Sequence, residues 1–360
     1  MKARGGERTD AAEESWTGRR ITRRKLLAVA AAGIGVGTLN SCSLVRVRQP
    51  EIKGSGTERK GPIKLAVVPK ALGFDFWEKV RLGAECAASK HDEVTIQWDG
   101  TTAETDIIGQ VNLLTNYITQ GVDGLVYAAT DARVLSQVTQ LALDHGIVVV
   151  NIDSGTDPQP EEVPLFATDN VTAARKVAGL ISGELKEKGK EGGKLAFIPF
   201  QPGTSTNDQR ATGFRQGLEE HPNLDLVAQQ SSESDYVTGL QVTENIMSAY
   251  PDLDGIFAAN EPGVLGAAEA MYSLDTAGEV VIAGWDASPA EVAALRDGVV
   301  KALVVQNPFQ MGYRGVNAAV ETIRTGKRVE SEPTGTTYVT KENLDDPEVQ
   351  AVINPSCKTT

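Results

Sequence analysis

From residue 63 onward, short apolar runs alternate with amphipathic segments. Runs such as Leu65-Ala66-Val67-Val68 are typical of strands that are buried on both faces. Longer segments with apolar residues three and four positions apart are typical of amphipathic helices. Strands are predicted at residues 63–68, 94–98, 124–128, 147–150, 165–167, 194–199, 224–229, 255–258, 280–284 and 300–305. Helices are predicted at residues 74–89, 105–119, 132–145, 173–188, 207–220, 236–250, 263–272 and 310–325.

This alternation predicts the α/β fold class. Parallel strands joined by helices form a sheet that is covered by helices on both faces. Ten strands are more than one doubly wound sheet usually holds, so we predict two doubly wound parallel-sheet lobes. A length of 360 residues also suits two domains. In folds of this type, ligands bind just beyond the carboxyl ends of the strands.

Polar and aromatic residues follow nearly every predicted strand at that end. The candidate ligand-binding residues found there are Lys70, Phe76, Trp77, Asp153, Asn207, Arg210, Asn260, Trp285, Asp286 and Gln306. Simpler interpretations stay open for several of them, because loop lysines are often solvated, aromatic pairs are often core, and Asp or Asn can cap the next helix. The combination of acids, amides, one arginine and tryptophans favours a binding site.

These residue types suit a sugar. Carboxylates such as Asp153 and Asp286 accept hydrogen bonds from adjacent hydroxyl groups, Arg210 donates them, and Asn260 and Gln306 do both. An aromatic ring face covers the apolar C–H side of a sugar ring. Two acids against one arginine and one lysine disfavour a strongly anionic ligand. We therefore expect a neutral polyol.

Composition and charge exclude several other classes. The net charge of −13 disfavours nucleic acid as a partner, and three cysteines exclude a disulfide-rich scaffold. Three scattered histidines show no metal-ligand spacing, so we expect no metal and no cofactor. Residues 1–42 carry eight basic and four acidic residues, which leaves 27 basic and 44 acidic residues for the rest of the chain. Two regions of opposite charge suggest two separate roles.

Residues 1–42 are typical of an export signal. Arg23-Arg24 stands just before an uncharged run from Leu26 to Leu39, which is too short to span a bilayer as a helix. The paired arginines resemble the twin-arginine type. Leu39-Asn40-Ser41-Cys42 resembles a lipobox, so Cys42 is the predicted lipidation site, with an ordinary cysteine as the alternative. Residues 43–61 are then a polar tether, and we expect a lipid-anchored protein in the periplasm or at the outer cell surface.

Several short motifs occur in combination between residues 63 and 339. They are Phe76-Trp77, Ile152-Asp153, Thr168-Asp169-Asn170, Gly203-Thr204-Ser205, Arg210, Gly213-Phe214, Phe257-Ala258-Ala259-Asn260-Glu261, Trp285-Asp286 and Gln306. Together they resemble the type I periplasmic binding proteins of the ribose/galactose class, the solute receptors of ABC importers. The resemblance implies two lobes on a three-strand hinge that close around one monosaccharide, and it adds Thr168 to the expected site. It also implies a non-enzyme that serves an ABC permease, and we expect a monomer.

The resemblance further implies domain boundaries. The first lobe is expected at residues 62–168 plus 307–333, and the second at residues 169–306 plus 334–345. Residues 346–360 are expected as a C-terminal tail. The crossovers between lobes are expected near Thr168, Gln306 and Pro333.

Departures from the ribose pattern leave the sugar open. Ala128-Ala129 stands where the ribose type has Asn, and Ser154 stands where it has Arg. Val68-Pro69-Lys70 resembles rhamnose and autoinducer-2 receptors instead. Other functions also stay open: the binding component of a membrane sensor, a glycosidase that uses Asp153 and Asp286 as its acid pair, or the ligand domain of a transcriptional regulator. A regulator needs a helix-turn-helix, whereas residues 1–60 show a signal-like run and a tether.

Cys86 lies on the apolar face of a predicted helix, and we expect it in the core. A disulfide with Cys357 is the alternative in an oxidising compartment.

Overall fold

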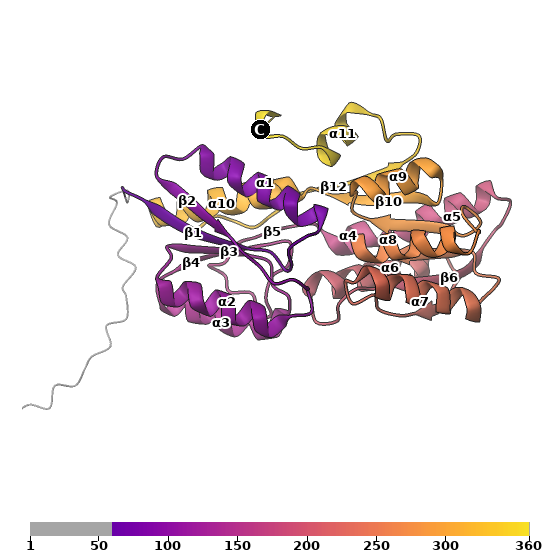
Figure 1. Ribbon diagram of the computed structural model, residues 1–360, viewed down its shortest axis with the longest axis horizontal. Helices are drawn as coiled ribbons and strands as arrows, with labels where there is room; N and C mark the ends of the chain where they lie inside the picture. The colour runs from indigo at the N-terminus through magenta and orange to yellow at the C-terminus, as the bar shows by residue number, and fades with distance from the viewer. Residues whose placement is uncertain (1–59, 360) are drawn as a thin grey trace, which may run out of the picture. The chain divides into compact units, whose positions relative to one another are not determined.

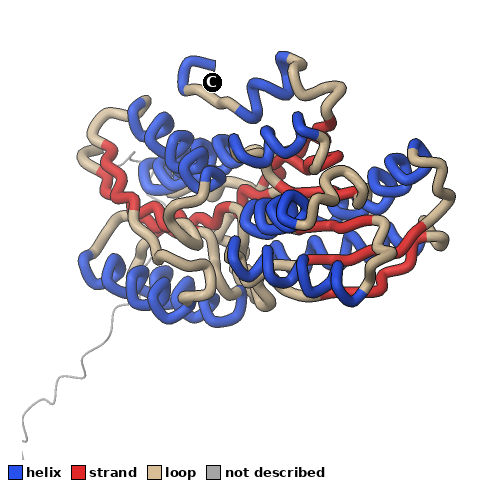
Figure 2. The backbone as a smooth tube through the Cα atoms, turned by 45° about the vertical axis from the view of Figure 1, so that its right-hand side comes forward, coloured by secondary structure: helices blue, strands red, loops and turns tan. Residues whose placement is uncertain are grey.

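The computed structural model describes residues 60–359. The expected export signal, the expected lipidation site Cys42 and nearly all of the expected tether therefore lie outside the described residues. The described chain contains two six-stranded sheets, each with helices on both faces (Figures 1 and 2). Within residues 60–359, no helix combines the length and apolar character that crossing a membrane requires.

The first lobe is built on a sheet in the order β11-β5-β4-β3-β1-β2. All of its strand pairs are parallel: β1 (Ile63–Val68), β2 (Val94–Trp98), β3 (Gly124–Tyr127), β4 (Val148–Ile152), β5 (Leu165–Ala167) and β11 (Glu332–Pro333). Two helices pack on one face, α1 (Asp75–Ser89) and α10 (Pro308–Thr325). The other face is covered by α2 (Ile107–Gln120) and α3 (Ala132–Asp144).

The second lobe repeats this plan with a sheet in the order β12-β10-β9-β8-β6-β7. Its strands are β6 (Gly193–Ile198), β7 (Leu224–Gln229), β8 (Gly255–Ala258), β9 (Val281–Trp285), β10 (Val300–Gln306) and the antiparallel edge strand β12 (Thr336–Thr340). One face is covered by α4 (Asn170–Arg175), α5 (Val177–Glu187) and α6 (Ser205–Glu220). The other face carries α7 (Tyr236–Ala249), α8 (Glu261–Ser273), α9 (Pro289–Asp297) and α11 (Pro347–Ile353).

The matching strand orders place β4 of the first sheet where β9 lies in the second. The chain passes from the first sheet to the second after Ala167, returns after Gln306, and crosses again between Pro333 and Thr336. Cross-lobe hydrogen bonds join the loops and helix starts that follow the parallel strands, so the carboxyl ends of these strands meet at the junction of the lobes. The predicted fold of two parallel-sheet lobes is confirmed.

Several elements differ from the sequence prediction. The helix predicted at residues 173–188 begins at Asn170 and is interrupted at Lys176, which separates α4 from α5. The elements β11, β12, α9 and α11 were not predicted, because they are short or lack a continuous apolar run. Within the expected tail, α11 buries Val349 and Ile353 in the core of the second lobe.

Cys86 of α1 forms a disulfide with Cys357, with a Cα–Cα distance of 5.5 Å. Of the interpretations left open for Cys86, the disulfide with Cys357 is the one that the structure contains. The apolar helix face did predict burial correctly, since Cys86 is buried. Its partner lies 271 residues away in a short 3₁₀ helix (Cys357–Thr359), a distance over which no local pattern is informative.

Candidate functional site

Two aspartates occupy matching positions at the carboxyl ends of the two sheets. Asp153 follows β4 and Asp286 follows β9, and both have left-handed backbones, with φ of 57° and 83°. Their amides donate to the neighbouring strand in the same way, Asp153 to Phe166 O at 3.0 Å and Asp286 to Val304 O at 2.9 Å. A left-handed residue other than glycine costs on the order of 1 kcal/mol or more. Two such residues at equivalent places indicate a functional role for both.

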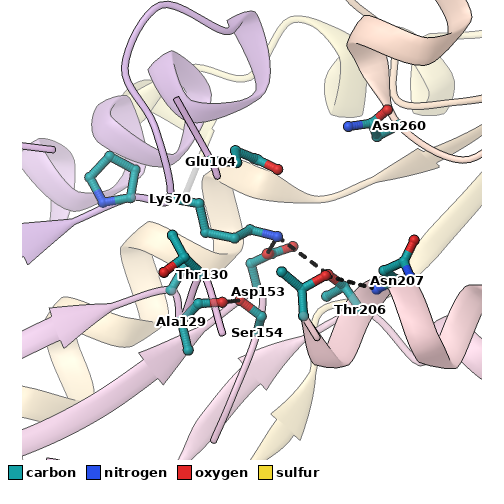
Figure 3. A network of polar contacts seen from close by, with 12 residues as sticks. Lys70, Glu104, Ala129, Thr130, Asp153, Ser154, Thr206, Asn207 and Asn260 are labelled. Carbon is teal, nitrogen blue, oxygen red and sulfur yellow. Dashed lines mark hydrogen bonds and ion pairs between the residues drawn. The ribbon is translucent and has the colours of Figure 1, made fainter. Parts of the chain in front are cut away.

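Lys70, which follows β1, is buried between the lobes. Its Nζ lies 2.9 Å from Asp153 Oδ2 and donates to Thr206 Oγ1 of the second lobe at 3.3 Å (Figure 3). The ammonium group also lies over the rings of Trp77 and Phe200, at 5.6 and 5.4 Å from their centroids. A buried charge is tolerated when it is paired and hydrogen-bonded. Lys70 and Asp153 therefore form an ion pair that faces the second lobe.

Arg210 of α6 is the corresponding cation of the second lobe. Its Nε donates to Asn170 Oδ1 at 2.9 Å, one of its terminal nitrogens donates to Ala259 O, and the guanidinium lies 4.2 Å from the centroid of the Trp285 ring. Burial lowers the pKa of Arg210 below its ordinary value, while Asp286 opposes that shift. The side chain is thus fixed in orientation beside Asp286.

Three predicted residues form a hydrogen-bond chain at the crossovers. Gln306 Nε2 donates to Asp286 Oδ1 at 2.8 Å, and Thr168 Oγ1 donates to Gln306 Oε1 at 2.8 Å. Thr168 follows the first crossover strand and Gln306 ends the second. Asp286 is therefore connected directly to the segments about which the lobes would move.

A second chain of hydrogen bonds crosses the cleft through Glu104. Its Oε1 accepts from Trp77 Nε1 at 3.1 Å, and its Oε2 accepts from Ser234 Oγ of the second lobe at 2.7 Å. Asn260 Nδ2 in turn donates to Ser234 Oγ at 3.1 Å. Figure 3 shows Glu104 beside Lys70. Glu104 was not among the predicted site residues; it lies in the loop between β2 and α2.

The aromatic pair after β1 is divided between two roles. Phe76 lines a small cavity between the lobes together with Glu261, Asp286 and Gln306. Trp77 is 1% exposed and packs behind Phe76, with the ring centroids 4.7 Å apart in an edge-to-face arrangement. In this arrangement Phe76 therefore faces the cavity, while Trp77 contacts the cleft residues Lys70 and Glu104.

Asn207 organises the loop that leads into α6. Its Oδ1 accepts from Phe200 N at 3.0 Å, and its Nδ2 donates to Asp208 Oδ1 at 3.2 Å. The neighbouring Thr206 receives the bond from Lys70. Asn207 thus lies at the site, and the hydrogen bonds of its side-chain amide hold the loop in its conformation.

All eleven predicted ligand-binding residues lie at the junction of the lobes or directly behind it, and all are buried. Further bonds join the lobes around them: Gln201 Nε2 donates to Thr130 O at 3.2 Å, and Ala132 N donates to Gly203 O at 3.0 Å. The structure is therefore of a closed arrangement, in which charged side chains from both lobes share one buried site.

Three carboxyl groups of the second lobe lie close together beside this site. Burial raises the pKa of Glu261 from 4.5 to about 7, and repulsion by Asp286 adds to the shift. Burial also raises the pKa of Asp286 from 3.8 to about 6, although Arg210 and Gln306 oppose the shift. The pKa of Glu291 is raised well above its ordinary value by burial and by its two acidic neighbours.

We expect this cluster to make the protein, in the closed arrangement that the structure describes, less stable as pH rises from about 4.5 to about 7. In that window the native state holds protons that the unfolded state has already lost. Unfolding therefore releases protons, and a rise in pH favours it. Glu261 alone contributes on the order of 3 kcal/mol over its shift. Thermal melting across the window measures the effect, and Glu261→Gln should flatten the profile. A melting temperature that is constant or rises with pH would contradict the prediction.

Comparisons with known proteins cover most of the described chain. A family model described as a periplasmic binding protein domain matches residues 65–328. The D-ribose/D-allose-binding protein of Pseudomonas aeruginosa is 31% identical over 278 residues, which cover 76% of this chain and 85% of that protein.

Two solved structures share the arrangement of the lobes. A carbohydrate transporter solute-binding protein from Agrobacterium radiobacter, in complex with D-arabinose, is 28% identical with a TM-score of 0.78 and covers 82% of this chain and 100% of its own. An ABC transporter solute-binding protein from Agrobacterium vitis, with bound D-fucose, is 31% identical with a TM-score of 0.75 and covers 81% of this chain and 99% of its own.

Proposed function

The chain belongs to the periplasmic binding protein domain family, and from that premise we propose that it captures one monosaccharide between its lobes and delivers it to the permease of an ABC importer. It is a solute-binding protein of a sugar-transport family and not an enzyme. The family is periplasmic, so the folded body works outside the cytoplasm.

One observation carries the proposal: charged and polar side chains from both lobes are buried together where the lobes meet. Asp153 and Asp286 supply acceptors for hydroxyl groups, Arg210 and Lys70 supply donors, and Phe76 supplies an apolar face. Hydrogen bonds to charged groups contribute roughly 1.5–3 kcal/mol each. A neutral sugar can therefore favour the closed arrangement, provided that it binds this arrangement more tightly than the open one.

We expect the first lobe to make fewer hydrogen bonds to the hydroxyl groups of the sugar than the first lobe of ribose receptors makes. Ala128 and Ala129 follow β3 without a polar side chain, and the hydroxyl of Ser154 already donates to Ala129 O at 2.7 Å. The related proteins bind different neutral sugars, among them D-arabinose and the deoxysugar D-fucose. These features support a pentose, a hexose or a deoxysugar other than ribose.

We expect the matching sugar to raise the melting temperature of the purified body by several degrees, because a ligand that binds only the native state stabilises it. A thermal-shift panel of D-ribose, D-allose, D-arabinose, D-fucose and L-rhamnose measures this effect, with citrate as an anionic control. Failure of every neutral polyol to shift the transition would contradict the proposed function.

We propose further that residues 1–42 direct export and that Cys42 carries the lipid anchor. The support is the sequence pattern of Arg23-Arg24, the short apolar run and the lipobox-like end. A Cys42→Ser variant should leave the membrane fraction of expressing cells, and its continued fractionation with membranes would contradict the anchor.

A further inference from the structure

Glu261, the first residue of α8 in the second lobe, reaches across the cleft to the start of α1 in the first lobe. Its Oε1 accepts from Asp75 N at 3.3 Å, and its Oε2 accepts from Phe76 N at 3.1 Å. The first amides of a helix lack partners within the helix. The residue before α1, Phe74, makes no side-chain capping bond among the described residues. A side chain of one lobe thus caps a helix of the other.

This cap exists only when the lobes are closed. In an open arrangement, water solvates both the α1 amides and the Glu261 carboxylate. Closure removes that water, and the amides then need an acceptor, since a buried unpaired backbone N–H is costly. Because Glu261 also begins α8, its carboxylate lies at the positive ends of two helices from different lobes.

We propose that Glu261 is a closure latch, a positioning residue that stabilises the closed arrangement by capping α1 across the cleft. The inference rests on the proposed function, because closure is taken to be the step that captures the sugar. The apparent affinity for any ligand scales with the population of the binding-competent closed form. Glu261 therefore sets how tightly every sugar is held, without selecting among sugars.

The surroundings of Glu261 support this role over a role in folding. Beside it, Lys79 Nζ of α1 donates across the cleft to Ala287 O at 2.8 Å, so the contact is a broader cross-lobe surface. Within its own lobe, Glu261 is close to the acids Asp286 and Glu291. Like charges repel, so the side chain costs the second lobe stability when ionised. Removing it should weaken closure without weakening the fold.

The test compares Glu261→Ala with Glu78→Ala in the otherwise unchanged body at about pH 7.5. Glu78 lies in the first turn of α1, is exposed, and pairs with Arg81 of the same helix, so its removal changes the same charge without touching the cleft. Binding of D-ribose, D-allose, D-arabinose and D-fucose is measured by calorimetry and stopped-flow tryptophan fluorescence. We expect Glu261→Ala to weaken every sugar that the wild type binds by about 10- to 100-fold, mainly through faster release.

The same variant should melt, without ligand, at the wild-type temperature or above it, and Glu78→Ala should bind like the wild type. Unchanged affinity in Glu261→Ala would overturn the latch. A loss confined to one sugar would show direct ligand contact and would also overturn it, as would a fall in ligand-free melting temperature large enough to explain the weaker binding.

A second measurement separates failure of the latch from failure of the proposed function. If no sugar binds the wild type, the proposed function fails, and the latch is judged on ligand-free protein. Fluorescent labels at Val134→Cys on α3 and Val237→Cys on α7 report the distance between lobes, since both positions are exposed. A smaller closed population in Glu261→Ala than in the wild type supports the latch. Identical distance distributions overturn it.

Discussion

Asp286→Asn is expected to abolish sugar binding without lowering the stability of the ligand-free protein. The carboxylate of Asp286 is buried beside Arg210 and is oriented by Gln306, so it is placed to accept hydrogen bonds from two adjacent hydroxyl groups. Loss of two charge-assisted bonds corresponds to about 3–6 kcal/mol, or roughly a 100- to 10,000-fold loss of affinity. Because burial raises the pKa of Asp286 to about 6, replacing its ionised form by a neutral amide removes an unfavourable buried charge.

Two measurements on the same variant check this prediction. The sugar that shifts the wild type should produce no shift in Asp286→Asn, and the ligand-free melting temperature should be equal or higher at about pH 7.5. Asp225→Asn is the matched control, since Asp225 lies exposed on the edge strand β7 of the same lobe. Wild-type affinity in Asp286→Asn would contradict the prediction that Asp286 binds the sugar. Arg210→Ala should also abolish the shift, but with a loss of stability, because it leaves Asp286 buried without its cation. In Asp286→Asn, by contrast, the Arg210 guanidinium keeps the nearby carboxylates of Asp153 and Glu104.

Much of the fold was predictable because burial on both faces leaves a strong signal. The strand β8 is a continuous apolar run, β1 is apolar apart from Lys64, and the intervening helices carry clear apolar faces. The location of the site was predictable for a related reason: parallel strands place their carboxyl ends at one edge, so Asp153 and Asp286 had to lie near that edge. The helix α9 was missed although Ser288 and Glu291 form a capping box that the sequence displays.

The cross-lobe contacts were not predictable from local pattern. Glu104 and Ser234 are 130 positions apart, and Phe76 and Glu261 are 185 positions apart. The contacts across the cleft depend on how the two lobes approach each other. The periodicity of apolar residues in the sequence carries no information about that approach. The sequence does place Glu261 after β8, yet it gives no sign that the α1 helix lacks a cap of its own.

The disulfide between Cys86 and Cys357 makes the end of the chain a covalent link between the lobes. The helix α11 packs in the core of the second lobe through Val349 and Ile353, whereas Cys357 is bonded to α1 of the first lobe. Only residues 354–356 separate α11 from the 3₁₀ helix that carries Cys357. The chain therefore crosses between lobes once more after its three hinge segments.

Removal of this disulfide is expected to lower the free energy of unfolding by about 2–5 kcal/mol and the melting temperature by roughly 3–8 °C. The bond joins positions 271 residues apart, so its loss frees a long loop in the unfolded state. The core contacts of α11 remain when the disulfide is removed. The loss of stability therefore comes mainly from the lost constraint on the unfolded chain. Melting of the wild type with and without reductant measures the effect, and a Cys86→Ser, Cys357→Ser double variant should melt like the reduced wild type and ignore reductant. The prediction would be contradicted if thiol titration showed two newly reduced cysteines while the melting temperature stayed the same.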